Sequence, residues 1–417
     1  MRVLGAIFAI SVAIPIASAT TYLVRPDGTG DYPTIQAAID GVSGGDVIEL
    51  ADGTFTGDGN RDVSYLGKEI TVRSQSGDAQ SCIIDCEGSA TDCHRAFVFE
   101  SGEGPDAVLE GVTITNGFVE DTWDIWAGSG GAIRMRDASP RFSNVVFSGN
   151  TASMGGAVYV YLGSTEFSDC SFVDNTSTWG GTGGIWCIDS ELITVTDCVF
   201  IGNIGYQGAG GLSCGNTASR VTGCWFQDNY TIMGAGGLVL RGPAEVSDCT
   251  FASNRGDYGA GGASLAGSDE IVFGRCTFWG NSSPSGPGGL EIVWGNAPLL
   301  TLEHTIIASS TAGEAMDCGD IGSATLTCCD LYGNEGGDWI GCIAGQYGIS
   351  GNISEDPMFC DPENGDFHLD CNSPCAPFSP PNPECDLIGA WPVGCGGTPT
   401  LVTTWGEVKA LFRREAN

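Results

Sequence analysis

Apolar and polar residues alternate with a period of two through most of the chain, in short runs bounded by turn residues. In the run Ser-Asp-Cys-Ser-Phe at positions 168–172, Cys170 and Phe172 would point to one side of a strand, and Asp169 and Ser171 to the other. Asn and Gly-Gly after such a run are turn formers, so each strand is expected to span only a few residues. The pattern predicts an all-β chain of short strands.

This run recurs at a nearly constant spacing. Six phenylalanines lie 25 to 28 residues apart, and each is followed three positions later by an asparagine and then by a glycine pair. Five of them have a cysteine two positions earlier. The members are Phe147, Phe172, Phe200, Phe226, Phe251 and Phe278; Asn150, Asn175, Asn203, Asn229, Asn254 and Asn281; and Cys170, Cys198, Cys224, Cys249 and Cys276. Self-similarity at such a period is the signature of a stacked repeat.

Each repeat is too rich in glycine for a helical unit, because glycine costs a helix about 1 kcal/mol per residue. Leucine-rich repeats are disfavoured because their leucine spacing is absent. One coil of short strands per repeat predicts a right-handed parallel β-helix, with coils about 4.8 Å apart. The phenylalanines are expected to stack inside it. The asparagines are expected in a left-handed turn conformation that bonds coil to coil, and the glycine pairs at corners with positive φ.

Two motifs carry a family resemblance: Phe-Ser-Gly-Asn at 147–150 and Gly-Gly-Ala-Ile at 130–133. They resemble the repeats of chlamydial-type polymorphic outer membrane proteins, and residues 22–340 more broadly resemble the pectin-lyase-like superfamily of β-helices. The resemblance implies a helix capping the first coil, predicted at residues 34–40. It implies no single activity, because that superfamily includes lyases, hydrolases, esterases and adhesins.

The chain divides into four predicted parts. Residues 1–19 resemble a signal peptide, with Arg2, an apolar run over 3–16 and a small-residue cleavage site. Residues 20–345 are the predicted β-helix, 346–397 a Cys/Pro-rich closing segment, and 398–417 a linker with a short C-terminal helix. This organisation predicts a secreted or cell-surface protein with no membrane span after signal removal.

The formal net charge of −35, from 51 acidic and 16 basic residues, excludes nucleic acid and anionic membranes as partners. It also disfavours polyanionic sugars unless cations bridge them. Calcium would suit the carboxylates, but the acidic residues are dispersed, so a solvated acidic surface is favoured over specific calcium sites. No cofactor is predicted. Zinc is disfavoured because no Cys-x-x-Cys pair exists.

Nineteen cysteines in an exported chain suggest disulfides, and the odd count leaves at least one unpaired. The five repeat cysteines are expected to stay reduced and to pack in the core as small apolar side chains. The better disulfide candidates lie in the loop-rich ends. They are Cys82, Cys86, Cys93, Cys360, Cys371, Cys375, Cys385 and Cys395.

An insert over residues 117–129 lengthens one coil, and a loop of this kind either covers the core or builds a site. If Ile133 and Met135 face inward, the side chains next to them form an outer strip of aromatic and basic residues beside the insert. The candidate ligand-binding residues are Trp123, Trp126, Arg134, Arg136, Tyr159 and Tyr161. Later coils, with Leu212 and Cys214, suggest the opposite phase and hence a discontinuous strip.

No catalytic residue can be assigned from the sequence. Asp169, Asp197 and Asp248 share one position in the repeat, but a row of turn aspartates explains them equally well. The favoured interpretation is a non-catalytic binding or adhesion module for an extracellular glycan or a surface protein. The alternative is a carbohydrate-active enzyme, either a polysaccharide lyase or a glycoside hydrolase. A clustered pair of carboxylates, or an arginine beside a calcium cage, would favour the enzyme.

Overall fold

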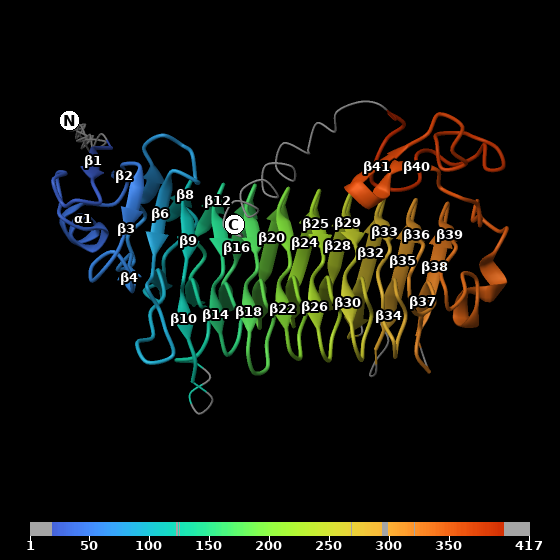
Figure 1. The fold of residues 1–417 in the computed structure, drawn as a ribbon, viewed down its shortest axis with the longest axis horizontal. Helices are drawn as coiled ribbons and strands as arrows, with labels where there is room; N and C mark the ends of the chain where they lie inside the picture. The colour runs from blue at the N-terminus through green and yellow to red at the C-terminus, as the bar shows by residue number, and fades with distance from the viewer. Residues whose placement is uncertain are drawn as a thin grey trace, which may run out of the picture.

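The protein is an all-β parallel solenoid whose coils stack along one axis (Figure 1). The structure is a computed structural model that describes residues 19–121, 124, 126–267, 269–293, 299–320 and 322–395. The predicted signal peptide (but for Ala19), the linker and C-terminal helix at 398–417, and Trp123 lie outside these residues. Within the described part, no helix is long and apolar enough to cross a membrane.

Two long parallel sheets form two faces of the solenoid. Sheet 1 contains, in order, β1 (Thr21–Val24), β2 (Val47–Leu50), β5 (Thr71–Ser74), β8 (Val108–Glu110), β12 (Arg141–Ser143), β16 (Thr165–Ser168), β20 (Leu192–Thr196), β24 (Ala218–Thr222), β28 (Ala244–Ser247), β32 (Glu270–Gly274), β35 (Leu299–Glu303) and β38 (Ser323–Thr327). Sheet 2 contains β3 (Gly53–Phe55), β6 (Cys82–Asp85), β9 (Thr113–Thr115), β13 (Val146–Ser148), β17 (Ser171–Val173), β21 (Val199–Ile201), β25 (Trp225–Gln227), β29 (Thr250–Ala252), β33 (Thr277–Trp279), β36 (Ile306–Ala308) and β39 (Asp330–Tyr332).

Two further parallel sheets complete each coil. Sheet 3 contains β4 (Val63–Ser64), β7 (Phe97–Phe99), β11 (Ile133–Arg136), β15 (Val158–Tyr161), β19 (Ile185–Ile188), β23 (Leu212–Gly215), β27 (Leu238–Arg241), β31 (Ala263–Ala266), β34 (Leu290–Ile292) and β37 (Met316–Asp317). Sheet 4 contains the short strands β10 (Phe118–Val119), β14 (Thr151–Ala152), β18 (Thr176–Ser177), β22 (Ile204–Gly205), β26 (Tyr230–Thr231) and β30 (Arg255–Gly256).

The helix predicted at the first coil is present as α1 (Ile35–Gly41), and the side chain of Thr34 caps its N-terminus. Ile35, Ala38 and Ile39 are fully buried and join the core. The helix therefore covers the apolar end of the solenoid, and the hairpin of β40 (Phe359–Asp361) and β41 (Asp366–Leu369) lies over the side of later coils (Figure 1).

The six repeat phenylalanines form the predicted ladder inside the solenoid. Each is paired in register with the next, and neighbouring ring centroids lie 4.4–4.8 Å apart with nearly parallel planes. The rings are fully buried or nearly so. Offset and parallel aromatic contacts of this kind stabilise stacked coils beyond the burial of apolar area.

The asparagines also form a ladder, but not in the conformation expected. In each coil Nδ2 of one asparagine donates to Oδ1 of the next; for Asn175 and Asn203 the distance is 3.0 Å. The positive φ lies one residue earlier, as at Asp174 and Asp228, so the prediction of left-handed asparagines is wrong. The preceding residue makes the turn, and this leaves the asparagine side chain directed inward.

The glycine pairs serve close packing more than positive φ. Gly130 and Gly155 have positive φ, but the pairs of the later coils do not. A Cβ on Gly211 would lie 2.7 Å from the carbonyl oxygen of Gly237 and 2.9 Å from the ring of Phe226. Glycine is therefore required there because the next coil and the phenylalanine ladder leave no room for a side chain.

The five repeat cysteines are reduced and buried, as predicted. Burial raises the pKa of the Cys198 and Cys249 thiols well above the ordinary value. The disulfide prediction for the ends was wrong for five candidates, because Cys82, Cys86, Cys93, Cys371 and Cys375 are free. The three disulfides join Cys318–Cys342, Cys328–Cys385 and Cys360–Cys395. Disulfides are typical of oxidising compartments.

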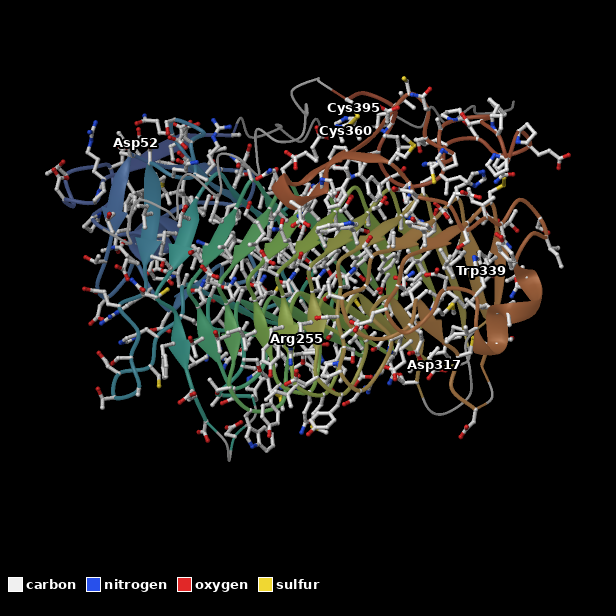
Figure 2. All side chains as sticks on the ribbon, turned by 45° about the vertical axis from the view of Figure 1, so that its right-hand side comes forward. Asp52, Arg255, Asp317, Trp339, Cys360 and Cys395 are labelled. Atoms are coloured by element: carbon white, nitrogen blue, oxygen red, sulfur yellow. A yellow bond between two sulfur atoms is a disulfide. The ribbon has the colours of Figure 1, made fainter. Side chains whose placement is uncertain are left out.

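Residues 357–395, called the closing strap below, fold back over the outer face of sheet 2 (Figure 1). The ring of Phe367 packs on Trp225 and Trp279 at centroid distances of 5.6 and 5.7 Å. The indole N–H of Trp391 donates to Oγ1 of Thr250 over 2.8 Å. Figure 2 shows the strap disulfide Cys360–Cys395 on the side of the solenoid away from Asp317.

Candidate functional site

The outer face of sheet 3 carries the predicted strip. The parallel register places Arg134 beside Tyr159 and Tyr159 beside Trp186, each one coil apart. In the same strands Ile133 and Met135 are fully buried. Because side chains alternate along a strand, burial of one set directs the other set outward.

The strands of sheet 3 keep the same phase in the later coils, which corrects the expected change of phase. Leu212 pairs with Ile185 and Leu238 with Leu212, and all three are fully buried. Aligning the coils by their glycine pairs gives the wrong phase. In later coils Gly184 occupies the position that Ala157 holds in the earlier coil, so counting from the pair shifts the phase by one residue.

The insert places Trp126 over the beginning of this strip. Its ring lies edge-on to Tyr159 and Tyr161, at 5.9 and 6.4 Å between centroids. The guanidinium carbons of Arg134 and Arg136 lie 4.7 and 5.5 Å from the same ring, within the range of cation–π attraction. The structure thus brings together five of the six predicted residues.

A buried arginine fixes the insert. Arg95 donates to the carbonyl oxygens of Ala127 and Ser129, at 2.7 and 2.8 Å. Burial lowers the pKa of Arg95 to about 10, so the guanidinium remains charged at neutral pH. These two hydrogen bonds hold the backbone that follows Trp126, and therefore position its ring.

The five residues differ in what they can offer a ligand. Arg134 is paired with Glu100 at 2.6 Å, and its side chain is 16% exposed. Tyr159 is 8% exposed, and burial raises its pKa to about 12. Arg136 is 52% exposed, and Trp126 and Tyr161 are partly exposed. Arg134 and Tyr159 are therefore supports, whereas Trp126, Arg136 and Tyr161 face solvent.

The aromatic surface continues along the axis through residues not predicted from the sequence. Trp186 is partly exposed and packs edge-on against Tyr159, at 5.6 Å. The turns that enter sheet 3 carry a row of exposed side chains: Trp179, Tyr206, Met233 and Tyr258. The signal was present in the repeat, because each of the four lies three or four residues after a ladder asparagine.

A carboxylate lies farther along the same face, beyond this row. The register aligns Ser264, Glu291 and Asp317 on consecutive coils. Ser264 Oγ lies 3.1 Å from Oε2 of Glu291, and burial, with a contribution from Asp317, raises the pKa of Glu291. A Cβ on Gly259 would be 3.4 Å from the same oxygen, so the turn after Tyr258 lies against this carboxylate.

The row of aspartates in the repeat consists of turn residues. Asp169, Asp197 and Asp248 all have positive φ. Asp248 forms a bidentate pair with Arg275, at 2.6 and 2.8 Å. In the described part of the chain, no group of three or more His, Cys, Asp or Glu side chains is arranged to hold a metal ion. These aspartates have a structural explanation in the turn.

Comparison with known proteins agrees with this architecture. Residues 70–251 match the family model described as the right handed beta helix region. The sequence has no significant match among curated proteins. Among solved structures, pectate lyase Pel9A is 14% identical, with 91% of this chain and 98% of that chain covered and a TM-score of 0.58. The fold is therefore a right-handed parallel β-helix.

Two other solved structures are more distant. A pectin methylesterase from carrot is 13% identical over 81% of this chain and 88% of that chain, with a TM-score of 0.30. The PL6 family alginate lyase AlyGC is 14% identical over 76% of this chain and 53% of that chain, with a TM-score of 0.36. Only the pectate lyase is similar enough to support an argument, and it supports the fold alone. The resemblance to polymorphic outer membrane proteins stays a prediction.

Proposed function

We propose that this protein binds a polysaccharide along the outer face of sheet 3. The observation that carries the proposal is the solvent-facing group of Trp126, Arg136 and Tyr161, which Trp186 continues on the next coil. Aromatic rings offer flat apolar faces to the C–H faces of sugars, and arginine donates to their hydroxyl oxygens. Coils repeat about every 4.8 Å, so an extended glycan can contact successive coils.

The charge of the protein narrows the ligand class. The net charge of −35 repels polyanions, and Arg134 is already neutralised by Glu100. Arg136 is 52% exposed but lies 3.6 Å from the carboxylate of Asp137, so its charge is also partly balanced. The surface therefore favours a neutral or sparsely charged glycan.

Retention of the chain without its predicted signal peptide on a panel of polysaccharides tests the proposal. Trp126→Ala and Tyr161→Ala should each weaken binding by about fivefold, since an aromatic contact contributes roughly 1 kcal/mol beyond buried area. Tyr347→Ala is the matched control, because Tyr347 is 57% exposed at the far end of the chain. Unchanged retention in both strip variants would overturn the proposal.

A second candidate is a carbohydrate-active enzyme, and Glu291 is the observation that favours it. The raised pKa of Glu291 keeps its carboxyl protonated to higher pH, as a general acid requires. Asp317 lies one coil away and could act as the second carboxylate that glycoside hydrolysis needs. The similar structure with a TM-score of 0.58 is named a pectate lyase, and it gives the adhesion interpretation no support. The adhesion module is therefore not confirmed.

The same panel separates binding from cleavage. If the protein is a hydrolase, new reducing ends should appear with the retained polysaccharide. Glu291→Gln should then abolish product release and leave retention unchanged, because it removes the ionisable proton and preserves the shape of the side chain. Retention without products, with and without added calcium, would leave the protein as a binding module.

A further inference from the structure

The closing strap is held on the solenoid by a contact that includes a buried carboxyl group. Asp330 begins β39 and is aligned with Ile306 on the outer face of sheet 2, where it is completely buried. Its Oδ1 accepts from the backbone N–H of Glu355 over 3.1 Å, and its Oδ2 lies 3.1 Å from Sγ of Cys375 in the strap. Asp330 therefore joins the solenoid directly to the strap.

The surroundings of this carboxyl are apolar. The side chains packed together here from the solenoid and the strap are Ile306, Ala308, Cys328, Ile353, Leu369, Cys375, Cys385 and Ile388. In the described part of the chain no Lys, Arg or His forms an ion pair with Asp330, and a buried carboxylate without a cation is strongly disfavoured.

The ionisable groups that face this contact are acidic or thiol groups. Cys375 faces Asp330 from the strap, Glu355 and Asp338 act on it from the segment before the strap, and Cys329 precedes it in the chain. Burial, strengthened by Glu355 and Asp338, raises the pKa of Asp330 to about 7, and the bonds from Cys375 and Glu355 oppose the shift. Asp356 faces Cys375 from the same side.

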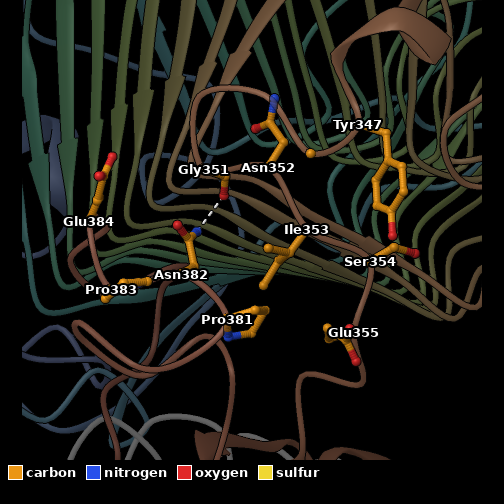
Figure 3. Close-up of a pocket in the computed structure, with 11 residues that line it drawn as sticks. Tyr347, Gly351, Asn352, Ile353, Ser354, Glu355, Pro381, Asn382, Pro383 and Glu384 are labelled. Carbon is orange, nitrogen blue, oxygen red and sulfur yellow. Dashed lines mark hydrogen bonds between the residues drawn. The ribbon is translucent and has the colours of Figure 1, made fainter.

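A cavity lies next to this contact. A cavity of about 420 Å³ separates residues 347–355 from residues 381–384 of the strap, and Ile353, Glu355, Asn382 and Glu384 line it (Figure 3). Asn382 donates to the carbonyl oxygen of Gly351 across one side of the cavity. The strap is therefore not packed tightly on both sides of the contact, so solvent can enter when it moves.

We propose that Asp330 is a pH-sensitive latch, whose protonated carboxyl holds the closing strap on sheet 2 and whose ionisation loosens it. The disulfide Cys328–Cys385 tethers the strap beside the latch, so the opening is local and reversible. Loosening uncovers the apolar band beneath Phe367, which includes Trp225 and Trp279.

The direction of the pH dependence follows from the burial of Asp330. With the strap closed its pKa is about 7, whereas a solvated aspartate keeps the ordinary value of 3.8. The contribution of Asp330 to closure of the strap is therefore complete below pH 3.8, declines as the pH rises, and is lost above about pH 7. Because one proton is released on opening, the opening equilibrium should rise by nearly tenfold per pH unit between these limits.

Hydrogen exchange of the chain without its predicted signal peptide, corrected for the intrinsic effect of pH on amides, measures this opening. Strap amides should lose protection from pH 5 to 7, while amides of the ladder coils at residues 172–254 should not. Asp330→Asn keeps the shape and both contacts and should make strap protection independent of pH. The control Glu355→Gln changes an exposed neighbouring acid and should retain the pH dependence.

Two results would overturn the latch. One is a parent chain in which the protection of the strap amides changes with pH in the same way as that of the ladder coils. This measurement needs no variant, so it holds even if Asp330→Asn fails to fold. The other is an Asp330→Asn chain whose strap keeps the parental pH dependence.

Discussion

Truncating one rung of the asparagine ladder, Asn203→Ala, should be far more damaging than its small change in volume suggests. Asn203 is fully buried, and its Oδ1 accepts from both the backbone N–H and the Nδ2 of Asn175, at 3.1 and 3.0 Å. Its own Nδ2 donates to the carbonyl oxygen of Phe172 and to Oδ1 of Asn229. Alanine replaces none of these four hydrogen bonds.

The magnitude follows from the groups left without partners. Two donors of Asn175 lose their acceptor in a dry interior, and each buried unsatisfied group costs about 1–3 kcal/mol. The two acceptors are the carbonyl oxygen of Phe172 and Oδ1 of Asn229. Losing their donor costs less free energy, because Asn229 Oδ1 still accepts from the backbone N–H of Asn203. The expected loss in free energy of unfolding is therefore about 2–6 kcal/mol, a large fraction of the 5–15 kcal/mol typical of a domain.

Urea unfolding followed by both circular dichroism and tryptophan fluorescence measures this loss, provided that the two transitions coincide. Asn372→Ala is the matched control, because the hydrogen bonds that its amide donates, to Asp370 and to Sγ of Cys371, are both exposed. Its effect should stay within about 0.5 kcal/mol. If Asn203→Ala shifts the midpoint no more than Asn372→Ala does, the ladder is not what stabilises the stacked coils.

Two further predictions concern the interior. Gly211→Ala should destabilise the protein by about 1–3 kcal/mol in the same unfolding assay, because its Cβ would collide with Gly237 and Phe226. Gly274→Ala, where a Cβ meets no atom within 4 Å, should be neutral, and equal losses at both positions would contradict the packing argument. Alkylation of the folded chain, read by peptide mass spectrometry, should label the exposed Cys93 and Cys371 and spare the buried repeat cysteines, because the reagent cannot reach them. Rapid labelling of Cys198 before unfolding would refute the reduced, buried ladder.

The solenoid and its ladders could be predicted from the sequence because a β-helix is nearly one-dimensional. A residue that recurs every 25 to 28 positions occupies the same place in each coil, so Phe200 and Phe226 had to stack once the coil length was recognised. Burial of the repeat cysteines followed from the same periodicity, whereas the capping helix α1 was expected from the family resemblance.

Other features depended on how one coil lies on the next. The turn length varies between coils, so counting from the glycine pairs gave the wrong phase for Leu212. Only the interstrand register determines that the strands of sheet 3 keep one phase. The left-handed turn residue, Asp174 rather than Asn175, was misplaced because both are turn formers, and the sequence pattern does not say which of two adjacent turn formers takes the positive φ.

The tertiary structure alone decided which distant residues meet. Ser264, Glu291 and Asp317 are about one coil apart in sequence, and no local pattern marks them as neighbours. Asp330 and Cys375 meet only because the strap reverses over sheet 2. The sequence by itself determined the periodic interior, because each coil buries the same positions. The outer surface is not periodic, so its contacts depend on the stacking of coils and the return of the strap.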